Sequence, residues 1–419
     1  MTAREPLRLV PRLRLPECKN QGGWRLTTLG DVLEEHGFKS DGTAEVHSVS
    51  LSKGIVPQIE HLGRSFAASD TGHYGLVRPF DVVYTRSPLA EFKLGIVKQH
   101  KSDHNVIVSP LYGVFEPRNR CIGLLVAAFF ESSARAFRYL DPLAQKGAKN
   151  TIQLSNERFL SGSLYLPEGE DEQRRVAEFL GSLDDLIAAE GRKLEALRQH
   201  KQGLMQQLFP LPGATRPRLR FPEFQHAGDW EEKRLGDLGT LISGLTYKPT
   251  DVQDDGLLVL RSSNIQNGEI TLDDCVYVRR DVNGANLTQP GDILICVRNG
   301  SRTLIGKNAI VPKGMPACTH GAFMTVFRSS SPHFVHVVLQ TTSYVQQVAA
   351  NLGATINSIN GSQLLKYRFI VPKPAEQQQI AALFSSLDDV LAAQSRRVDA
   401  LKAHKQGLLQ QVFPPVEDQ

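Results

Sequence analysis

The chain has 419 residues, of which 41% are hydrophobic and 22% charged, and its formal net charge at pH 7 is +4. This length suggests two or three domains, the composition excludes bulk disorder, and the mild positive charge permits nucleic-acid binding without indicating it. The longest apolar run, Cys121 to Phe130, is much shorter than the ~20 residues of a membrane span. The first residues lack the apolar core of a signal peptide, and the five cysteines lack paired spacing. We therefore expect a cytoplasmic protein with reduced thiols.

The first predicted element is an opening motif that returns in the second half of the chain. Residues 11–17, Pro-Arg-Leu-Arg-Leu-Pro-Glu, recur at 217–223 with one substitution. The same offset of 206 residues pairs Trp24 with Trp230, the only two tryptophans, and residues 29–31 with 235–237. We expect both tryptophans to pack in a core where each domain begins.

A variable middle follows each opening motif. Short β-rich runs at 75–77 and 81–84 in the first middle, and at 257–260 and 292–297 in the second, are separated by Gly, Pro, Asn and Asp. This pattern is typical of a mixed α/β domain with long loops. The two middles share little beyond Pro-x-Asp at residues 79–81 and 290–292.

Each middle is followed by a predicted long helix. Residues 172–210 align without a gap with residues 376–414, and about half of the aligned positions are identical. Apolar residues recur every three or four positions, as in a coiled-coil seam. About 38 residues at ~1.5 Å each predict a helix roughly 57 Å long. The seam is interrupted by polar residues, and each copy holds a glycine, Gly203 or Gly407, that suggests a close crossing or a local break. The interruptions are Glu190, Lys201, Gln394 and Lys405.

These elements predict two copies of one unit. The end of the chain resembles the start of the linker at 211–216, and the start of the chain resembles the end of that linker. Two like units pack economically if their helices pair antiparallel about a pseudo-two-fold axis. The expected fold is therefore mixed α/β, with two domains joined by two long coiled-coil helices. The predicted organisation is a first domain at 1–166, a helix at 167–210, a linker at 211–216, a second domain at 217–372, a helix at 373–414 and a tail at 415–419.

Catalytic motifs are weak in this sequence. Residues 300–308 resemble a phosphate-binding loop, but five residues instead of four separate the glycines, and Asn308 stands where Ser or Thr would hold magnesium. Glu223, Glu231 and Lys233 could form a degenerate nuclease triad, yet the first half has no counterpart. No motif for adenine methylation is present either. We therefore expect a chain that is not an enzyme, with no cofactor or metal of its own.

The middles instead carry residues suited to DNA. Arginine reads guanine through two hydrogen bonds, asparagine reads adenine, and serine binds phosphate or a base edge. Such residues gather at predicted strand ends and loops, most densely in the second middle. The predicted DNA-binding residues are Lys53, Arg64, Arg86, Tyr247, Lys248, Arg261, Ser262, Asn264, Arg298, Asn299, Arg302 and Lys307.

The doubled openings and closings resemble the specificity subunits of Type I restriction–modification enzymes, over nearly the whole chain. The closings read Glu-Gln, then Ser-Leu-Asp-Asp, then His-Lys-Gln-Gly-Leu and finally Phe-Pro. The resemblance implies that each middle is a target recognition domain for one half of a bipartite DNA site. It also implies that the helices set the spacing and dock two methyltransferase subunits, to which restriction subunits attach. S-adenosylmethionine, ATP and Mg²⁺ would then belong to those partners.

Two other functions fit parts of the sequence. A scaffold protein would need only the paired helices, and a fused nuclease would use Glu223, Glu231 and Lys233. Co-purification of a methyltransferase with salt-sensitive DNA binding supports the specificity subunit, whereas Mg²⁺-dependent cleavage by the isolated chain supports the nuclease.

Overall fold

The computed structural model describes residues 8–40, 42–64, 70–146, 152–352 and 357–414. The chain divides into two compact units, unit 1 with residues 1–192 and 396–419 and unit 2 with residues 193–395. Each unit contains one variable middle and parts of two long helices. The predicted tail at 415–419 lies outside the described residues.

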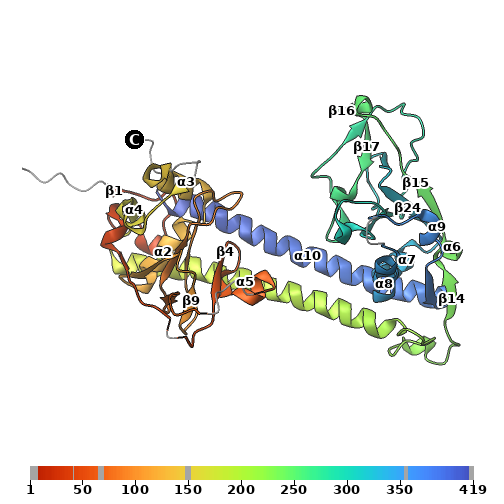
Figure 1. The fold of residues 1–419 in the computed structure, drawn as a ribbon, viewed down its shortest axis with the longest axis horizontal. Helices are drawn as coiled ribbons and strands as arrows, with labels where there is room; N and C mark the ends of the chain where they lie inside the picture. Colours follow the sequence, from red (N-terminus) through yellow and green to blue (C-terminus); the bar gives the residue numbers. More distant parts are fainter. Residues whose placement is uncertain (1–7, 41, 65–69, 147–151, 353–356, 415–419) are drawn as a thin grey trace, which may run out of the picture. The chain divides into compact units, whose positions relative to one another are not determined.

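The two long helices are α5 (Glu170–Leu208) and α10 (Pro374–Val412), each of 39 residues (Figure 1). Both begin two residues before the aligned repeat and end just before a Phe-Pro pair, where proline cannot continue the helical hydrogen bonds. Within unit 1, the first part of α5 pairs with the last part of α10 through Asp184 and Lys405. Within unit 2, the last part of α5 pairs with the first part of α10 through Lys201 and Asp388. The helices are therefore antiparallel within each unit, and the predicted mixed fold with two long helices is confirmed.

The expectation for the two helical glycines is wrong. The helices continue through Gly203 and Gly407 without a break. A Cβ atom added at either position would meet nothing within 4 Å, so neither glycine marks a close crossing. The predicted polar interruptions behave differently, because Lys201 and Lys405 occupy the ion pairs that join the helices.

The domain of unit 1 is built on a four-stranded sheet in the order β3-β10-β7-β8. The helix α2 (Arg120–Phe129) buries most of the predicted apolar run in the core of this unit. The strands of the sheet are β3 (Leu33–Glu35), β10 (Gly113–Pro117), β7 (Val82–Thr85) and β8 (Ile96–Gln99). The remaining strands are β1 (Arg8–Leu9), β2 (Trp24–Thr28), β4 (His47–Ser50), β5 (Gly54–Pro57), β6 (Gly75–Val77), β9 (Val106–Val108), β11 (Gln145–Lys146), β12 (Ile152–Gln153) and β13 (Ser163–Leu166). The other helices are α1 (Gln58–Leu62), α3 (Ser133–Leu140) and α4 (Asn156–Ser161).

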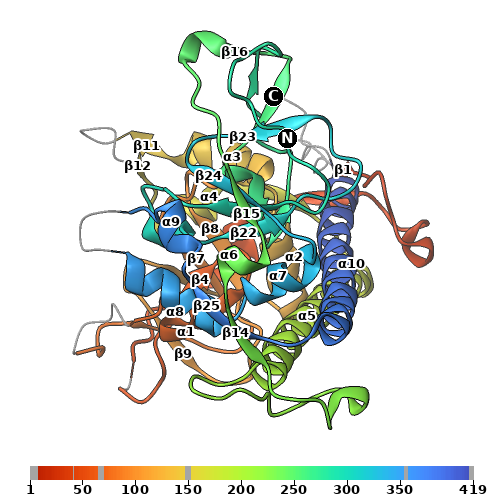
Figure 2. The same ribbon diagram turned by 90° about the vertical axis from the view of Figure 1, so that its right-hand side faces the viewer.

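The domain of unit 2 contains two four-stranded sheets, β15-β24-β21-β22 and β16-β20-β17-β23. The first has the strands β15 (Thr240–Ser243), β24 (Met324–Arg328), β21 (Ile293–Cys296) and β22 (Asn308–Ile310). The second has β16 (Val252–Gln253), β20 (Tyr277–Val278), β17 (Leu257–Leu260) and β23 (Cys318–His320). Outside these sheets are β14 (Glu231–Arg234), β25 (Arg368–Val371), β18 (Ile265–Gln266) and β19 (Glu269–Ile270). The helices are α6 (Leu235–Leu238), α7 (Pro332–Val338), which lies beside α10 (Figure 2), α8 (Thr342–Asn351) and α9 (Gly361–Leu364).

The shared Pro-x-Asp has a structural role in both units. Asp81 accepts a hydrogen bond from the backbone N–H of Arg78 at 2.7 Å, and Asp292 accepts one from that of Gln289 at 2.7 Å. Each carboxylate thus closes the turn that leads into the central strand, β7 or β21. A neighbour completes each site, because His36 bonds to Asp81 and the half-buried Arg328 forms a two-pronged ion pair with Asp292.

The opening motif ties each domain to its helices. In unit 1, Arg14 donates two hydrogen bonds of 2.7 Å to the buried carboxylate of Glu172 on α5. The backbone N–H of Leu13 donates to the carbonyl of Gln411 on α10. Trp24 is buried against Phe413, with the ring centroids 5.7 Å apart. One motif therefore contacts both long helices.

Unit 2 repeats these contacts with the roles of the helices exchanged. Arg220 pairs with the buried Glu376 on α10, and the backbone N–H of Leu219 donates to Gln207 on α5. Trp230 is buried against Phe209 at 5.9 Å. The prediction that both tryptophans pack in a core is confirmed. No helix within the described residues is long and apolar enough to cross a bilayer.

Candidate nucleic-acid interface

A cluster of polar side chains lies at one sheet edge of unit 2. β17 and β23 run parallel, so residues after their carboxyl ends meet at the same edge. Arg261 and Ser262 follow β17, and Phe323 lies three residues after β23. Asn299, in the loop after β21, joins this edge by donating a hydrogen bond from Nδ2 to Ser262 Oγ at 3.0 Å. We call Arg261, Ser262, Arg298, Asn299 and Phe323 the unit 2 edge cluster.

Arg298 has the side chain in this cluster that is most accessible to a ligand. Its side chain is exposed, and its guanidinium lies over the ring of Phe323, 5.6 Å from the centroid. Its backbone N–H donates to the carbonyl of Phe323 at 3.1 Å, which fixes the base of the side chain. Within the described residues the guanidinium has no ion pair or hydrogen bond, so its donors are available to a ligand.

Arg261 and Asn299 are more constrained. Arg261 forms an ion pair of 2.7 Å with Asp274, whose side chain is largely exposed. Asn299 already uses both ends of its amide, donating to Ser262 and accepting from the backbone N–H of Ser301 at 2.8 Å. These contacts order the loop beside Arg298 and leave Arg298 as the free group.

The prediction that Asn264 contacts DNA is wrong. Its side chain is 0% exposed, and its Nδ2 donates to the carbonyls of Thr271 and Asp274 at 3.0 Å each. Its Oδ1 accepts a hydrogen bond from the backbone N–H of Arg261 at 2.8 Å. Asn264 is therefore an internal support for the loop that carries Arg261. Sequence alone could not distinguish this role, because the same amide chemistry serves both.

The other predicted residues of unit 2 lie outside the edge cluster. Tyr247 is half-buried against the small core around β17, and Lys248 is exposed at the start of a 3-10 turn. Arg302 is exposed and donates a hydrogen bond to the carbonyl of Leu352 at 2.7 Å. Lys307 is half-buried and precedes β22. Contact of these four residues with DNA stays a prediction.

Unit 1 builds a similar edge. Val46 and Ile107 form a parallel bridge, so the turn with Lys53 after β4 and the loop after β9 lie at the same edge. Lys53 is exposed there, and Arg64 is exposed after α1. Arg86 instead points inward and donates hydrogen bonds to the carbonyls of Leu154 and Leu111 and to the Asn156 side chain. Its guanidinium therefore holds loops of unit 1 together.

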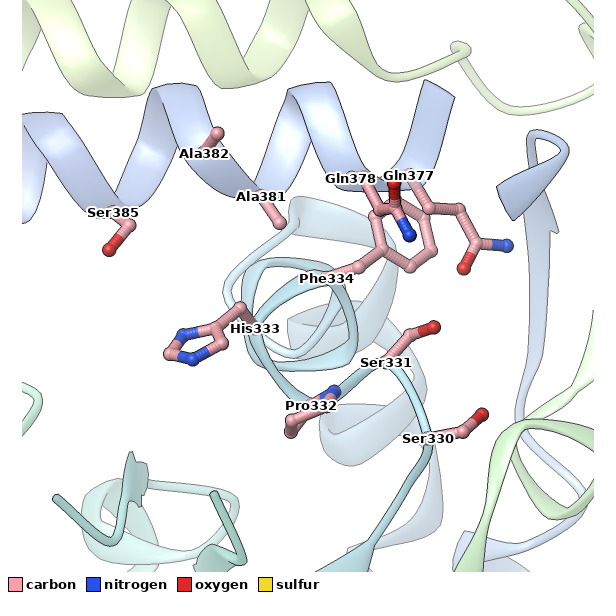
Figure 3. Close-up of a pocket in the computed structure, with 10 residues that line it drawn as sticks. All are labelled: Ser330, Ser331, Pro332, His333, Phe334, Gln377, Gln378, Ala381, Ala382 and Ser385. Atoms are coloured by element: carbon pink, nitrogen blue, oxygen red, sulfur yellow. The ribbon is translucent and has the colours of Figure 1, made fainter. Parts of the chain in front are cut away.

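A groove of about 350 Å³ lies between α7 and the first turns of α10 in unit 2 (Figure 3). Small and amide side chains of α10 form one wall, and the loop before α7 with its first residues forms the other. The residues that line the groove include Ser331, His333, Gln378, Ala381, Ala382 and Ser385. Such a surface lets a helix approach closely, because small residues leave room for another backbone.

The nuclease residues lack a metal-binding arrangement. Lys233 lies 3.9 Å from Glu231 on β14, and both side chains are solvent-exposed. The described part of the chain contains no group of three or more His, Cys, Asp or Glu residues placed to hold a metal ion.

Comparison with known proteins agrees with this architecture. Residues 227–403 match the family model "Type I restriction modification DNA specificity domain". The chain is 32% identical over 184 residues to the StySPI specificity subunit of Salmonella potsdam and to the EcoKI specificity subunit of Escherichia coli K12. Residues 227–403 thus resemble the DNA specificity domain of Type I systems. The alignments cover 42% of this chain and 38% of each relative, so the chain matches well under half the length of these relatives.

Solved structures extend the similarity of fold beyond those alignments. The S subunit of a Type I system from M. genitalium matches 97% of this chain and 100% of its own, with a TM-score of 0.59 and 13% identity. A chain from a study of assembly and conformational transition in the type I R-M system matches 96% of this chain and 99% of its own, with a TM-score of 0.50 and 18% identity. The similarity of fold therefore extends over unit 1, most of which lies outside residues 227–403.

Sequence reasoning missed the two exposed apolar residues at these edges, Phe323 and Leu111. Phe323 is 56% exposed and Leu111 is 71% exposed. Phe323 is the only large apolar side chain in the loop between β23 and β24, and Leu111 shares the loop between β9 and β10 with the half-buried Tyr112. Their place before a strand can be read from the sequence, but their exposure cannot, because it depends on the register of the sheets.

Proposed function

We propose that this chain is the DNA-reading subunit of a Type I restriction–modification enzyme, in which each unit reads one half of a bipartite site. The duplicated architecture supports this proposal. In both units the opening motif makes closely similar contacts with the two long helices, whereas the sheet edges of the two domains display different side chains. A duplicated frame gives two readers with a common geometry, and different edges give them different sequences to read. Sequence is read by side chains that reach base edges, whereas phosphate contacts set position.

Arg298 is the principal base reader in unit 2 under this proposal. Its free, exposed guanidinium suits the O6 and N7 acceptors of guanine. Arg298→Ala should weaken specific binding by roughly 5- to 150-fold, the effect of losing one two-pronged base contact. Lys233→Ala is the matched control, since Lys233 is an exposed cation of the same unit outside the edge cluster. A loss for Lys233→Ala with none for Arg298→Ala would reverse the assignment.

The long helices are the proposed docking surface for two methyltransferase subunits. On α5 an exposed face of Ser182, Asp185, Leu186 and Ala189 follows the spacing of neighbouring helical turns. On α10 the equivalent exposed face is Ser386, Asp389, Val390 and Ala393. Leu186 and Val390 are exposed apolar residues at equivalent positions, so two like surfaces are offered to two like partners. The groove beside Ala381 and Ala382 enlarges the surface on α10.

Catalysis belongs to the partners in this proposal. The methyltransferase subunits would hold S-adenosylmethionine, and restriction subunits that attach to them would use ATP and Mg²⁺. This chain would supply sequence choice and spacing, and would itself be non-catalytic.

The proposal is tested by co-expressing the tagged chain with the methyltransferase of a Type I system from the same host. We expect a complex of one chain and two methyltransferases in native mass spectrometry, with DNA binding that weakens steeply as salt rises. Leu186→Glu and Val390→Glu should each reduce the complex to one methyltransferase, and the double variant should bind none. A stable one-to-one complex of the wild-type chain in excess methyltransferase would contradict two-fold docking. Mg²⁺-dependent DNA cleavage by the chain alone would favour the nuclease.

A further inference from the structure

Phe323 and Leu111 occupy the same structural position in the two units. In unit 1, Tyr84 lies three residues after Asp81 of the shared turn and pairs with Gly113 on β10. In unit 2, Ile295 lies three residues after Asp292 and pairs with Thr325 on β24. Leu111 and Phe323 each lie two residues before that partner. The register of the sheets therefore makes them equivalent, although the surrounding sequences differ.

The loops hold both side chains outward from a fixed backbone. The Phe323 carbonyl accepts hydrogen bonds from the backbone N–H groups of Val297 and Arg298 at 3.0 and 3.1 Å. The Leu111 carbonyl accepts one from Arg86 Nη1 at 2.5 Å. In each unit the loop after the central strand thus anchors the exposed residue. A single exposed apolar side chain is ordinary on a protein surface. Two such side chains at equivalent positions, each with its backbone carbonyl hydrogen-bonded at the proposed DNA-reading edge, call for an explanation.

The chemistry of base edges gives these side chains one suitable partner. In the major groove the only apolar group of the four bases is the C5-methyl of thymine, and apolar side chains pack against it. The Arg298 guanidinium lies 5.6 Å from the Phe323 ring centroid, less than the height of two stacked base pairs. Arginine and phenyl ring therefore face the same or adjacent base pairs.

We propose that Phe323 and Leu111 are thymine readers, each packing against the C5-methyl of a thymine in the half-site of its own unit. In unit 2 this thymine lies beside a guanine read by Arg298. In unit 1 the guanidinium of Arg86, which contacts the Leu111 carbonyl, is engaged inside the unit and is not a reader in this proposal. The inference rests on the proposed function and adds to it a chemical group that each unit recognises.

Replacing thymine by deoxyuridine tests this, because it removes only the methyl group. The two half-sites are first found by sequencing the methylated bases of a host that expresses the chain with its methyltransferase. The complex is then titrated against fluorescent duplexes with one deoxyuridine at a time, at fixed salt. We expect one position in each half-site at which affinity falls about fourfold, as for loss of one buried methyl group.

The variants connect each position to its side chain. Phe323→Ala should lose about as much affinity as the sensitive deoxyuridine in the unit 2 half-site, and should no longer distinguish thymine from deoxyuridine there. Phe323→Leu, which places the unit 1 side chain in unit 2, should keep the distinction, and Leu111→Ala should abolish it only in the other half-site. Val345→Ala is the matched control, since Val345 is 58% exposed on α8 of the same unit.

Failure of this inference differs from failure of the proposed function. A wild-type complex that binds no specific DNA refutes the proposed function. A complex that binds a bipartite site but tolerates deoxyuridine at every thymine overturns the thymine readers alone. A half-site without thymine would do the same for its unit, as would a thymine distinction that survives Phe323→Ala and Leu111→Ala.

Discussion

The junctions between helices and domain differ in the two units at one buried lysine. In unit 1, Lys405 on α10 lies between Asp184 on α5 and Glu131, the residue after the end of α2 and its cap. Burial alone would lower the pKa of Lys405, but the carboxylates of Glu131 and Asp184 outweigh it and raise that pKa. Burial would likewise raise the pKa of Asp184, but Lys405 and Lys101 outweigh it and lower that pKa.

In unit 2 the equivalent Lys201 pairs with Asp388, but its contact with the domain is the amide of Gln340 at 2.8 Å. His336 lies beside this amide, and burial, with help from Lys201 and His333, lowers the pKa of His336 to about 4. His336 is therefore neutral at pH 7, and unit 2 has one carboxylate where unit 1 has two.

The difference separates what is repeated from what varies. The lysine and aspartate that join the two helices are the same in both units, whereas the group that joins helices to domain is a carboxylate in one unit and an amide in the other. The helix pair is thus a common frame, and each variable domain attaches to it with its own chemistry. Each unit also carries one tryptophan, which allows its unfolding to be followed separately.

The largest expected effect is the loss of the lysine in unit 1. Lys405→Met leaves Glu131 with Lys98 at 3.5 Å and Asp184 with Lys101 at 2.9 Å, and removes the buried cation that the two carboxylates share. It should destabilise unit 1 by about 3 kcal/mol, the low end for a broken buried ion pair. Lys201→Met should cost unit 2 about 1 kcal/mol, because Asp388 is more exposed and Gln340 is neutral. Urea unfolding followed by Trp24 fluorescence in a Trp230→Phe background, and the reverse, measures each unit. Equal losses would remove the distinction between the junctions.

The two units also differ in the hydrogen bonding of their buried tryptophans. Trp24 Nε1 donates a hydrogen bond of 3.0 Å to the buried Glu172, whereas the buried Trp230 Nε1 has no partner among the residues that the structure describes. Trp24→Phe should therefore destabilise unit 1 by about 2 kcal/mol, and Trp230→Phe should cost unit 2 about 1 kcal/mol. Hydrogen exchange of α2 and α7 peptides reports the two losses without tryptophan. A larger loss for Trp230→Phe would contradict this reading.

Converting one junction into the other should give a smaller effect. Gln340→Glu supplies Lys201 with a second carboxylate, as in unit 1, and should stabilise unit 2 by about 1 kcal/mol at pH 7. Trp230 fluorescence in urea measures the change, and Gln346→Glu at an exposed position of α8 is a matched control. Destabilisation by Gln340→Glu would show that burial beside His336 outweighs the new ion pair.

The smallest expected effect is a change in the stability of unit 1 at acidic pH, which arises from Asp184. Its folded pKa lies below the unfolded value, so its contribution is complete above about pH 4 and is lost as pH falls through the folded pKa. The stability difference between wild type and Lys405→Met should therefore shrink below about pH 4. Urea midpoints measured by Trp24 fluorescence test this, and a constant difference would exclude Asp184 as the partner that matters.

The sequence predicted the frame better than the reading edges. Internal repetition located the helices to within two residues, and alternation of β-rich runs located β6, β7, β17 and β21. The inward Arg86 could not be separated from exposed readers, because its partners come from loops distant in the sequence. The partners of the buried Asn264 lie within ten residues, but the same amide chemistry would also suit a base. The exposure of Phe323 could not be predicted either, because it depends on the register of β21 and β24.

The central claim is that sequence choice and spacing belong to different parts of the chain, and a helix insertion tests it most directly. Four residues inserted after Ala189 lengthen α5 by ~6 Å, and base pairs stack at ~3.4 Å. Part of the shift should be absorbed by rotation and by the stutter in the seam. Methylated-base sequencing of a host expressing the variant should show both half-sites unchanged and a spacer longer by one or two base pairs. An altered half-site, or an unaltered spacer in an active enzyme, would contradict the claim.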